Sequence, residues 1–417
     1  MKHPLTLTLL SLHIGLAYAQ TPVSQMADTP EFEEATELSP IVITATRGAK
    51  QKLEIPESVE VISAAQIEKH NINDAQDLIR HVPGVTVSRK SSGADPFANL
   101  SGFNIRGVGG NRLQVQVDGS RIIEEIQDGN RNFVDMSNLK SVEILKGPGS
   151  VLWGADALAG VVKFRTLDPQ DILQGQAWAG KVNLGYDSLN REFNQGFSLA
   201  SQINESNQVL LSATHRRSHE NKLSNARADG GVMGCPRVAD AIACNQLNPL
   251  RADVYNILGK WTWQPNENHE VKFTGEHFVS DSDAKQLYDY GLQANGSFNG
   301  DYDRHQKQTR SRFAIEDTWT PDLNWLNQAK IQLSYSPLKR DFWSNRQQIN
   351  AANKAVHTYS STNYEETFLQ ADVQFECQFE TGPVSHTLTY GFQGDHTQAD
   401  YDNLTVTNTN GTIVSKP

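Results

Sequence analysis

The sequence contains few cysteines and, beyond its first residues, no long apolar run. Three cysteines and four methionines occur among 417 residues, and 38% of the residues are hydrophobic. No later segment approaches the roughly 20 continuous apolar residues that a membrane-spanning helix needs. Acidic residues outnumber basic ones and give a formal net charge of -11, the opposite of the basic surface that binds nucleic acid. We therefore expect neither a later membrane-spanning helix nor a nucleic-acid partner.

Residues 1–19 have the composition of an export signal. A basic start at Lys2 precedes an apolar run from Leu5 to Leu16, and residues 17–19, Ala-Tyr-Ala, fit the small-residue pattern of a cleavage site. A short buried helix is the alternative, but the position at the extreme N-terminus favours a signal peptide. An exported protein without a spanning helix is free, anchored or a β-barrel.

Two of the cysteines lie close together in a polar segment. Cys235 and Cys244 are separated by eight residues in a stretch that contains glycine, asparagine and proline. In an oxidising compartment this spacing predicts a local disulfide. A metal site is the alternative, but no histidine lies between the two cysteines, so we predict the disulfide and no metal.

Residues 20–51 are predicted to form a flexible arm with one β-prone segment. Residues 20–39 are acidic and polar and have no periodicity, which is typical of disorder. The β-prone segment follows, and its backbone is suited to pairing with the sheet edge of another protein. Its residues are Pro40, Ile41, Val42, Ile43, Thr44, Ala45, Thr46 and Arg47. The alternative is an ordinary edge strand of the domain that follows.

Residues 52–166 are predicted to form a compact α+β domain. Ser63 is a helix N-cap candidate, and Pro83 with Gly84 ends a second helical pattern. Asp118-Gly119 separates two alternating runs and predicts a tight hairpin turn.

From residue 167 onward, apolar and polar residues alternate as in β-strands. The segment LQADVQFECQF, residues 369–379, alternates over eleven residues, which is the length of a tilted membrane strand and longer than the usual strand of a sandwich. Eight further segments alternate in the same way: 181–187, 192–200, 209–216, 254–263, 270–278, 312–319, 328–336 and 386–393.

The links between these segments alternate in length. Short links are followed by long ones at 217–252, 279–308 and 337–364, and the first link, DSLNR, is the one short member of the long series. This is the asymmetry of periplasmic turns and extracellular loops in an outer-membrane β-barrel. Tryptophans such as Trp261 and Trp325 gather near the short links, as expected at a membrane interface. Cys377 lies on the apolar side of its segment and is predicted to face lipid without a partner.

Together these features resemble the TonB-dependent outer-membrane receptors. The resemblance is carried by IPESVEVISAAQI, DLIRHVPGV, FNIRGVGGNRLQVQVDG and VEILKGPGSVLWGADALAGVVKFRT, in this order, and extends from Pro40 to the end. It implies an α+β plug domain over residues 52–166, followed over residues 167–417 by the N-terminal part of a transmembrane antiparallel β-barrel. Residues 40–47 would be the TonB box. No set of nucleophile, base and orienting residue is recognisable, so we expect no enzyme.

Small residues and tight turns in the plug would let its backbone pass close to the barrel wall. Trp153 is expected to pack inside, and Arg106 and Arg112 are expected to form internal ion pairs with Glu143; the alternative is that they are solvated surface charges. The residues predicted for the plug core are Arg106, Gly107, Asp118, Gly119, Glu143, Gly147, Pro148, Trp153, Gly154 and Gly160.

The resemblance implies active import across the outer membrane of a Gram-negative bacterium. TonB of the inner-membrane complex would add a strand to the box and pull on the plug, while outer-membrane lipid surrounds the barrel. The end of the plug most resembles the haem, haemoglobin and transferrin branch, in which haem or a haem protein is transported cargo and not a cofactor. Haem iron takes a His or Tyr ligand, and the candidates in predicted outer loops are His219, His305, His357, Tyr288 and Tyr290.

Two alternatives stay open. Residues 86–102 contain no histidine, where several haem receptors use one, so a ferric siderophore is the alternative cargo. Plugged barrels of this kind have about 22 strands, whereas nine are predicted here before an apparent polar loop at residues 414–417. An inactive, truncated receptor fragment is therefore the second alternative.

Overall fold

The computed structural model describes residues 41–42, 50–51, 57–87, 102–123, 134–154, 156–220, 249–286, 290–321, 323 and 325–416. The chain divides into the units Met1–Ser39 and Pro40–Pro417, and all described residues belong to the second. The predicted signal peptide and the predicted Cys235–Cys244 disulfide lie outside the described residues.

A five-stranded sheet forms the centre of the plug. β10 pairs antiparallel with β9 and parallel with β7, and all five side chains of β7 are buried. The spatial order is β3 (Val59–Ser63), β9 (Leu139–Lys146), β10 (Gly160–Thr166), β7 (Leu113–Val117) and β8 (Ser120–Arg121).

Short helices and a small second sheet complete the plug core. Ser63 caps the N-terminus of α1 (Ala64–Lys69) as predicted, because its side chain and its backbone nitrogen both bond to Gln66. The buried Ile67 and Leu78 pack in one apolar cluster with Phe103 and Phe164. Among the described residues, no helix is both long enough and apolar enough to cross a bilayer. The other elements are α2 (Ala75–Ile79), β4 (Val85–Val87), β5 (Phe103–Ile105), β6 (Val108–Gly109), η2 (Gly110–Arg112), η4 (Met136–Asn138), α3 (Ser150–Trp153) and α4 (Pro169–Leu173).

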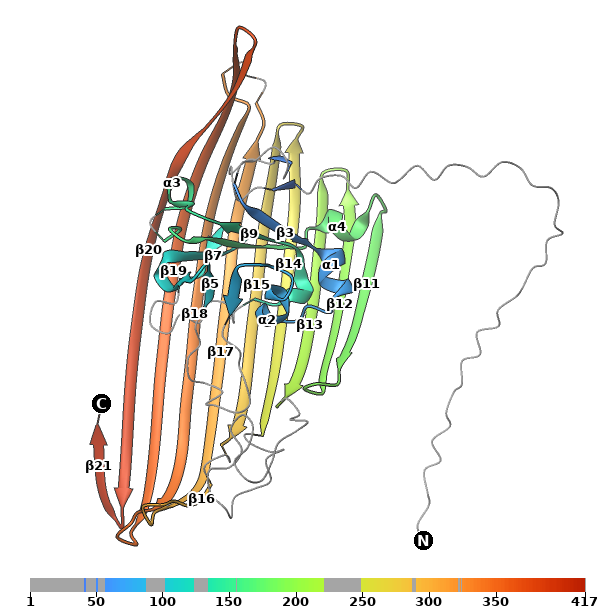
Figure 1. Ribbon diagram of the computed structural model, residues 1–417. Helices are drawn as coiled ribbons and strands as arrows, with labels where there is room; N and C mark the ends of the chain where they lie inside the picture. The colour runs from blue at the N-terminus through green and yellow to red at the C-terminus, as the bar shows by residue number, and fades with distance from the viewer. Residues whose placement is uncertain are drawn as a thin grey trace, which may run out of the picture. The chain divides into compact units, whose positions relative to one another are not determined.

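Eleven strands of the described residues form one large antiparallel sheet after the plug (Figure 1). Each of the nine predicted segments lies within one strand of this sheet, so the predicted fold class is confirmed. The strands are β11 (Trp178–Asp187), β12 (Glu192–Asn204), β13 (Asn207–His219), β14 (Leu250–Asn266), β15 (His269–Lys285), β16 (Gly291–Leu292), β17 (Phe298–Trp319), β18 (Gln328–Ile349), β19 (Ala355–Thr381), β20 (Val384–Thr409) and β21 (Thr412–Lys416).

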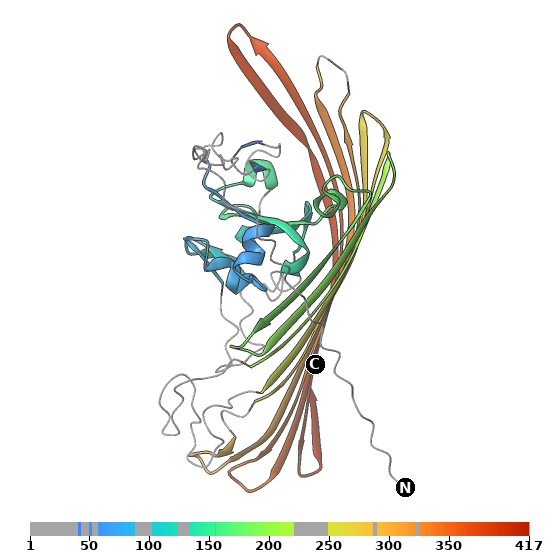
Figure 2. The same cartoon turned by 90° about the vertical axis from the view of Figure 1, so that its right-hand side faces the viewer.

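The two faces of this sheet differ in polarity. The plug lies against the concave face (Figure 2), where polar side chains such as Ser212, Arg310 and Gln370 are buried. The opposite face exposes large apolar side chains such as Leu184 and Leu369. This is the inward-polar, outward-apolar alternation of a membrane β-barrel wall.

The prediction that Cys377 faces lipid without a partner is wrong. Cys377 forms no disulfide, but its thiol donates to the hydroxyl oxygen of Tyr390 at 3.9 Å, and only 9% of the residue is exposed because it packs with Leu326 and Ala329. Its neighbours therefore cover it, and it does not face lipid as predicted.

Two links predicted to be long loops are strand over most of their length. β15 continues to Lys285 and β17 begins at Phe298, while β18 and β19 are joined by residues 350–354 alone. A strand of 27 residues, such as β19, extends about 90 Å, whereas the hydrocarbon core of a bilayer is about 30 Å thick. The alternation of apolar and polar residues therefore marks only the part of each strand that matches the thickness of a bilayer. Beyond that part the backbone pairing continues, with polar side chains on both faces of the sheet.

The last residues were also expected to form a polar loop, and this is wrong. β21 pairs with Thr405–Thr409 of β20. Asn410 and Gly411 both have positive φ and form the two-residue turn that joins antiparallel strands. The β-branched Thr412, Ile413 and Val414 then suit a strand.

The glycines of the plug have different roles from those predicted. Gly147 and Gly154 border open space, and a Cβ at Gly160 would lie 2.2 Å from the carbonyl oxygen of Leu145, within the plug itself. Only Gly119 of the predicted core glycines meets the wall, where its Cβ would lie 2.5 Å from Oε1 of Gln332.

We predict that Gly160→Ala destabilises the plug by more than about 2 kcal/mol, because the new methyl group would force β10 away from β9. The measurement is guanidinium unfolding of the protein in detergent micelles. Gly154→Ala is the matched control, since Gly154 has φ 89° and nothing within 4 Å of a Cβ, so it reports backbone strain alone. Equal destabilisation of the two variants would contradict the packing argument.

Candidate functional site

The candidate site is the interface at which the β7–β8 turn meets the large sheet. Asp118 and Gly119 form the predicted two-residue turn, with φ of 45° and 84°, and Val117 pairs with Ser120 across it. Positive φ at both positions is typical of a type I′ turn. This geometry presents the Asp118 carboxylate and two backbone carbonyls to the wall.

The carboxylate of Asp118 is held by groups from both the wall and the plug. Arg312 of β17 donates from Nη2 at 2.9 Å, and Nζ of Lys260 on β14 lies at 3.3 Å. Thr166, at the end of β10, donates from its backbone nitrogen at 2.8 Å and from its hydroxyl at 2.5 Å. Burial alone would raise the pKa of Asp118, but Lys260 and Arg312 hold it well below its usual range. The turn therefore carries a negative charge at physiological pH.

The backbone of the turn is bound by two wall glutamines. Gln332 of β18 donates from Nε2 to the carbonyl oxygen of Asp118 at 2.7 Å. Gln370 of β19 donates to the carbonyl oxygen of Gly119 at 3.0 Å and accepts from the backbone nitrogen of Arg121 at 3.0 Å. One turn of the plug thus contacts four wall strands.

Arg312 belongs to a buried charge network inside the wall. Glu276 of β15 accepts from Arg310 at 2.8 Å and from Arg312 at 3.0 Å. These side chains are at most 2% exposed. Two guanidinium groups therefore share Glu276, and the second negative charge is supplied by Asp118 of the plug.

A second contact lies where the plug leads into the barrel strands. Asp168 precedes α4 and accepts from Nζ of Lys260 at 2.9 Å and from Lys140. Nζ of Lys272 lies 3.8 Å from the same carboxylate. Burial would raise the pKa of Asp168, but the three lysines hold it far below its usual range. Lys260 thus bridges Asp118 and Asp168.

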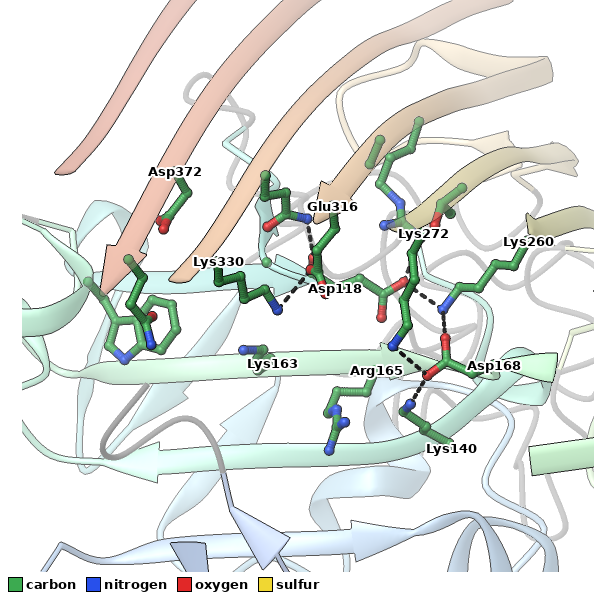
Figure 3. A pocket seen from close by; sticks show the side chains of 17 residues that line it. Asp118, Lys140, Lys163, Arg165, Asp168, Lys260, Lys272, Glu316, Lys330 and Asp372 are labelled. Carbon is green, nitrogen blue, oxygen red and sulfur yellow. Dashed lines mark hydrogen bonds and ion pairs between the residues drawn. The ribbon is translucent and has the colours of Figure 1, made fainter. Parts of the chain in front are cut away.

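A cavity of about 110 Å³ lies beside this network (Figure 3). Plug and wall both contribute to it, and its ionisable lining residues are Asp118, Lys140, Lys163, Arg165, Asp168, Lys260, Lys272, Arg312, Glu316, Lys330 and Asp372. Cations predominate in this lining.

Several residues predicted for the plug core are not in it. Trp153 is buried, but Arg106, Gly107, Pro148 and Gly154 are exposed, because they lie in turns between elements.

The predicted ion pair of Glu143 with Arg106 or Arg112 is also wrong. Glu143 is fully buried, and Nη1 of Arg165 on the neighbouring strand lies 3.5 Å from its carboxylate. Arg106 and Arg112 are exposed.

The predicted TonB box is only partly described. Ile41 and Val42 form β1 and pair antiparallel with β2 (Lys50–Gln51). Pro40, Ile43, Thr44, Ala45, Thr46 and Arg47 lie outside the described residues, as does Tyr288.

The candidate iron ligands are not brought together, and two of them are not in loops. His305 lies within β17 and His357 within β19, because these strands extend beyond the predicted membrane segment. Arg304 and Gln306 are buried against the inner face, so His305 points outward, and His357 shares that outward parity in β19. His219 ends β13, and Tyr290 lies between β15 and β16, with its ring 5.5 Å from that of Phe298.

The wall residues that hold the plug were not predicted from the sequence. Arg310 and Arg312 alternate with small or apolar residues, as do Gln332 and Gln370, and Glu276 lies between Gly275 and His277. A charged or amide side chain on the inward parity of an otherwise apolar strand is the signal that could have indicated them.

Comparison with known proteins gives the same architecture. A family model described as TonB-dependent Receptor Plug Domain matches residues 51–161. Lactoferrin-binding protein A of Neisseria meningitidis serogroup B is 29% identical over 57% of this chain and 26% of its own length. The hemin receptor of Yersinia pestis is 25% identical over 91% of this chain and 51% of its own length. The chain thus spans about half the length of these relatives or less.

A solved structure adds evidence on the fold alone. The ferric enterobactin receptor of Pseudomonas aeruginosa matches with a TM-score of 0.52 at 14% sequence identity, covering 85% of this chain and 60% of that chain.

We predict that Asp118→Asn destabilises the docked plug by about 3–5 kcal/mol, because it leaves Arg312 buried without its second counter-charge. Hydrogen exchange of the β7–β8 amides and thermal unfolding both measure this. Glu205→Gln, in an exposed turn, is the matched control. Arg312→Gln combined with Asp118→Asn should cost less than the sum of the single changes; simple additivity would show that the two side chains are not coupled.

Proposed function

Because the chain belongs to the TonB-dependent receptors, we propose that it acts as an outer-membrane receptor for the active uptake of an iron compound. The observation that carries this proposal is a plug turn held by buried polar side chains of a sheet whose other face is apolar. Such a seated plug closes a lumen and must be moved for cargo to pass. The proposal concerns the receptor formed with this plug and wall, since the chain covers 26% and 51% of the two relatives.

The outward apolar face supports a location in the outer membrane of a Gram-negative bacterium, with lipid around the sheet. We propose TonB as the energy-transducing partner, with residues 40–47 as its box. The antiparallel pair of β1 with β2 supports this, because Ile41 and Val42 have the extended backbone that strand addition requires.

We propose haem, or haem taken from haemoglobin, as the cargo. The support comes from a relative named as a hemin receptor that aligns over 91% of this chain. A ferric siderophore is the alternative cargo, favoured by the absence of histidine in residues 86–102. Haem or a ferric chelate would be transported and not retained as a cofactor, and the chain would catalyse no reaction. An inactive fragment is the second alternative.

The box assignment predicts that Val42→Pro abolishes haem-dependent growth of iron-starved cells that lack other haem receptors, because proline removes the backbone donor that a paired strand needs. Binding of haem to the cells should stay unchanged. Val23→Pro, in the polar part of the arm, is the matched control. Normal growth of the Val42→Pro strain would reject the box, and growth on ferric siderophores alone would assign the alternative cargo.

The outward direction of His305 and His357 predicts that their alanine variants bind haem like the wild type. Tyr290 remains the described candidate, because His219 shares the outward face with His305 through the register of β13, β14, β15 and β17. Absorbance titration with haem in detergent micelles measures this: His219→Ala should bind haem like the wild type, whereas Tyr290→Phe should shift the haem spectrum if Tyr290 is an axial ligand. A weaker affinity of His305→Ala or His357→Ala would contradict the outward assignment.

A further inference from the structure

The cavity between plug and wall has an excess of positive charge. Its lining contains seven cationic side chains, which are Lys140, Lys163, Arg165, Lys260, Lys272, Arg312 and Lys330, and four carboxylates, which are Asp118, Asp168, Glu316 and Asp372. The cavity holds about 110 Å³, whereas a single water needs about 15 Å³. It therefore has room for a small oxyanion or for one acidic arm of a larger molecule.

Six of these seven cations have carboxylate partners. Lys330 lies 2.8 Å from Glu316, and Lys272 lies 3.0 Å from Glu270. Arg165 pairs with Glu143. The cations Lys140, Lys260 and Arg312 pair with Asp118 or Asp168.

Lys163 is different from all of them. It is only 8% exposed, yet it forms no hydrogen bond and no ion pair within the part of the chain that the structure describes. Its ammonium group lies 4.9 Å from the centre of the Trp153 ring, a contact that is favourable but does not neutralise the charge. Figure 3 shows Lys163 on the plug side of the cavity and Lys330 on the wall side. Glu143 is paired with Lys163 across β9 and β10, but Arg165 is its ion-pair partner, and a buried ammonium that contacts no carboxylate is costly.

We propose that this cavity is an oxyanion site, in which a carboxylate or phosphate group binds Lys163 of the plug and Lys330 of the wall. Two oxygens of such a group accept hydrogen bonds from both ammonium groups and supply the missing negative charge. The bound anion bridges plug and wall at the seam along which the plug must move. Its source is either free phosphate or an acidic group of the cargo, and the second source rests on the proposed function.

The charges that face Lys163 support this assignment. Burial lowers the pKa of Lys163 to about 8. The carboxylates of Glu143 on β9 and Glu316 on β17 act against this shift, whereas the cations Lys330 on β18 and Arg165 on β10 add to it. The neutral amine does not attract an anion, so binding is present below pH 8 and is lost as the pH rises above it. A bound anion raises the pKa again.

The experiment is calorimetric titration of the full chain in detergent micelles with inorganic phosphate, and with sulfate across pH 6 to 10, since the charge of sulfate is constant there. We expect Lys163→Met to weaken binding at least tenfold and Lys163→Arg to retain it beyond pH 8. Lys330→Gln tests the wall side if Lys163→Met does not fold. Lys307→Met, an exposed lysine of β17, is the matched control. Equal binding by Lys163→Met and the wild type, or no binding by the wild type, overturns the site.

The source of the anion is decided by competition. Displacement of phosphate by haem, but not by haem dimethyl ester, assigns the cargo carboxylates, whereas no displacement by either assigns free phosphate. The two proposals also fail separately. Anion binding without haem-dependent growth refutes the uptake function and leaves the site, whereas growth with equal phosphate binding by Lys163→Met refutes the site alone.

Discussion

The ion pair between Asp118 and Arg312 is the constraint on which the arrangement of plug and wall depends. Arg312 is fully buried and shares Glu276 with Arg310, so the wall alone has one negative charge for two positive ones. The plug supplies the second carboxylate from the tip of a two-residue turn. Because an unpaired buried charge costs several kcal/mol, the charge of the wall is balanced only when the plug is in place.

The polar character of this interface also makes it reversible. Gln332 and Gln370 bind backbone carbonyls of the turn, and Lys260 bridges Asp118 and Asp168. Such groups form hydrogen bonds with water once they separate, so their net contribution is about 1 kcal/mol each. Apolar side chains form no hydrogen bonds with water, so the separation of an apolar interface of the same area is not compensated in this way. Under the proposed function, in which the plug moves under a pulling force, polar contacts therefore suit the interface better than apolar packing does.

Local patterns in the sequence predicted the elements, whereas the contacts between them depend on register. The alternation of LQADVQFECQF placed β19, and Asp118-Gly119 placed the turn, because period and turn chemistry are local properties. The partner of Glu143 could not be found this way, since Arg165, which is paired with Ser141, comes within 3.5 Å of Glu143 only through the register of β9 with β10. His305 was assigned to a loop because polar residues on both faces of a strand beyond the bilayer resemble a loop in sequence.

The interface between plug and wall contains one cluster in which every charge has a partner and a second cluster in which the ammonium group of Lys163 contacts no carboxylate of the described residues. Around Asp118 every charge has a partner, and the pKa of its carboxyl group is held low. Around Lys163 the neighbouring carboxylates already serve Arg165 and Lys330. A buried lysine that served only to support the fold would be better replaced by an apolar residue of similar size. The charge at position 163 therefore makes physical sense chiefly when an anion enters the cavity and joins plug to wall.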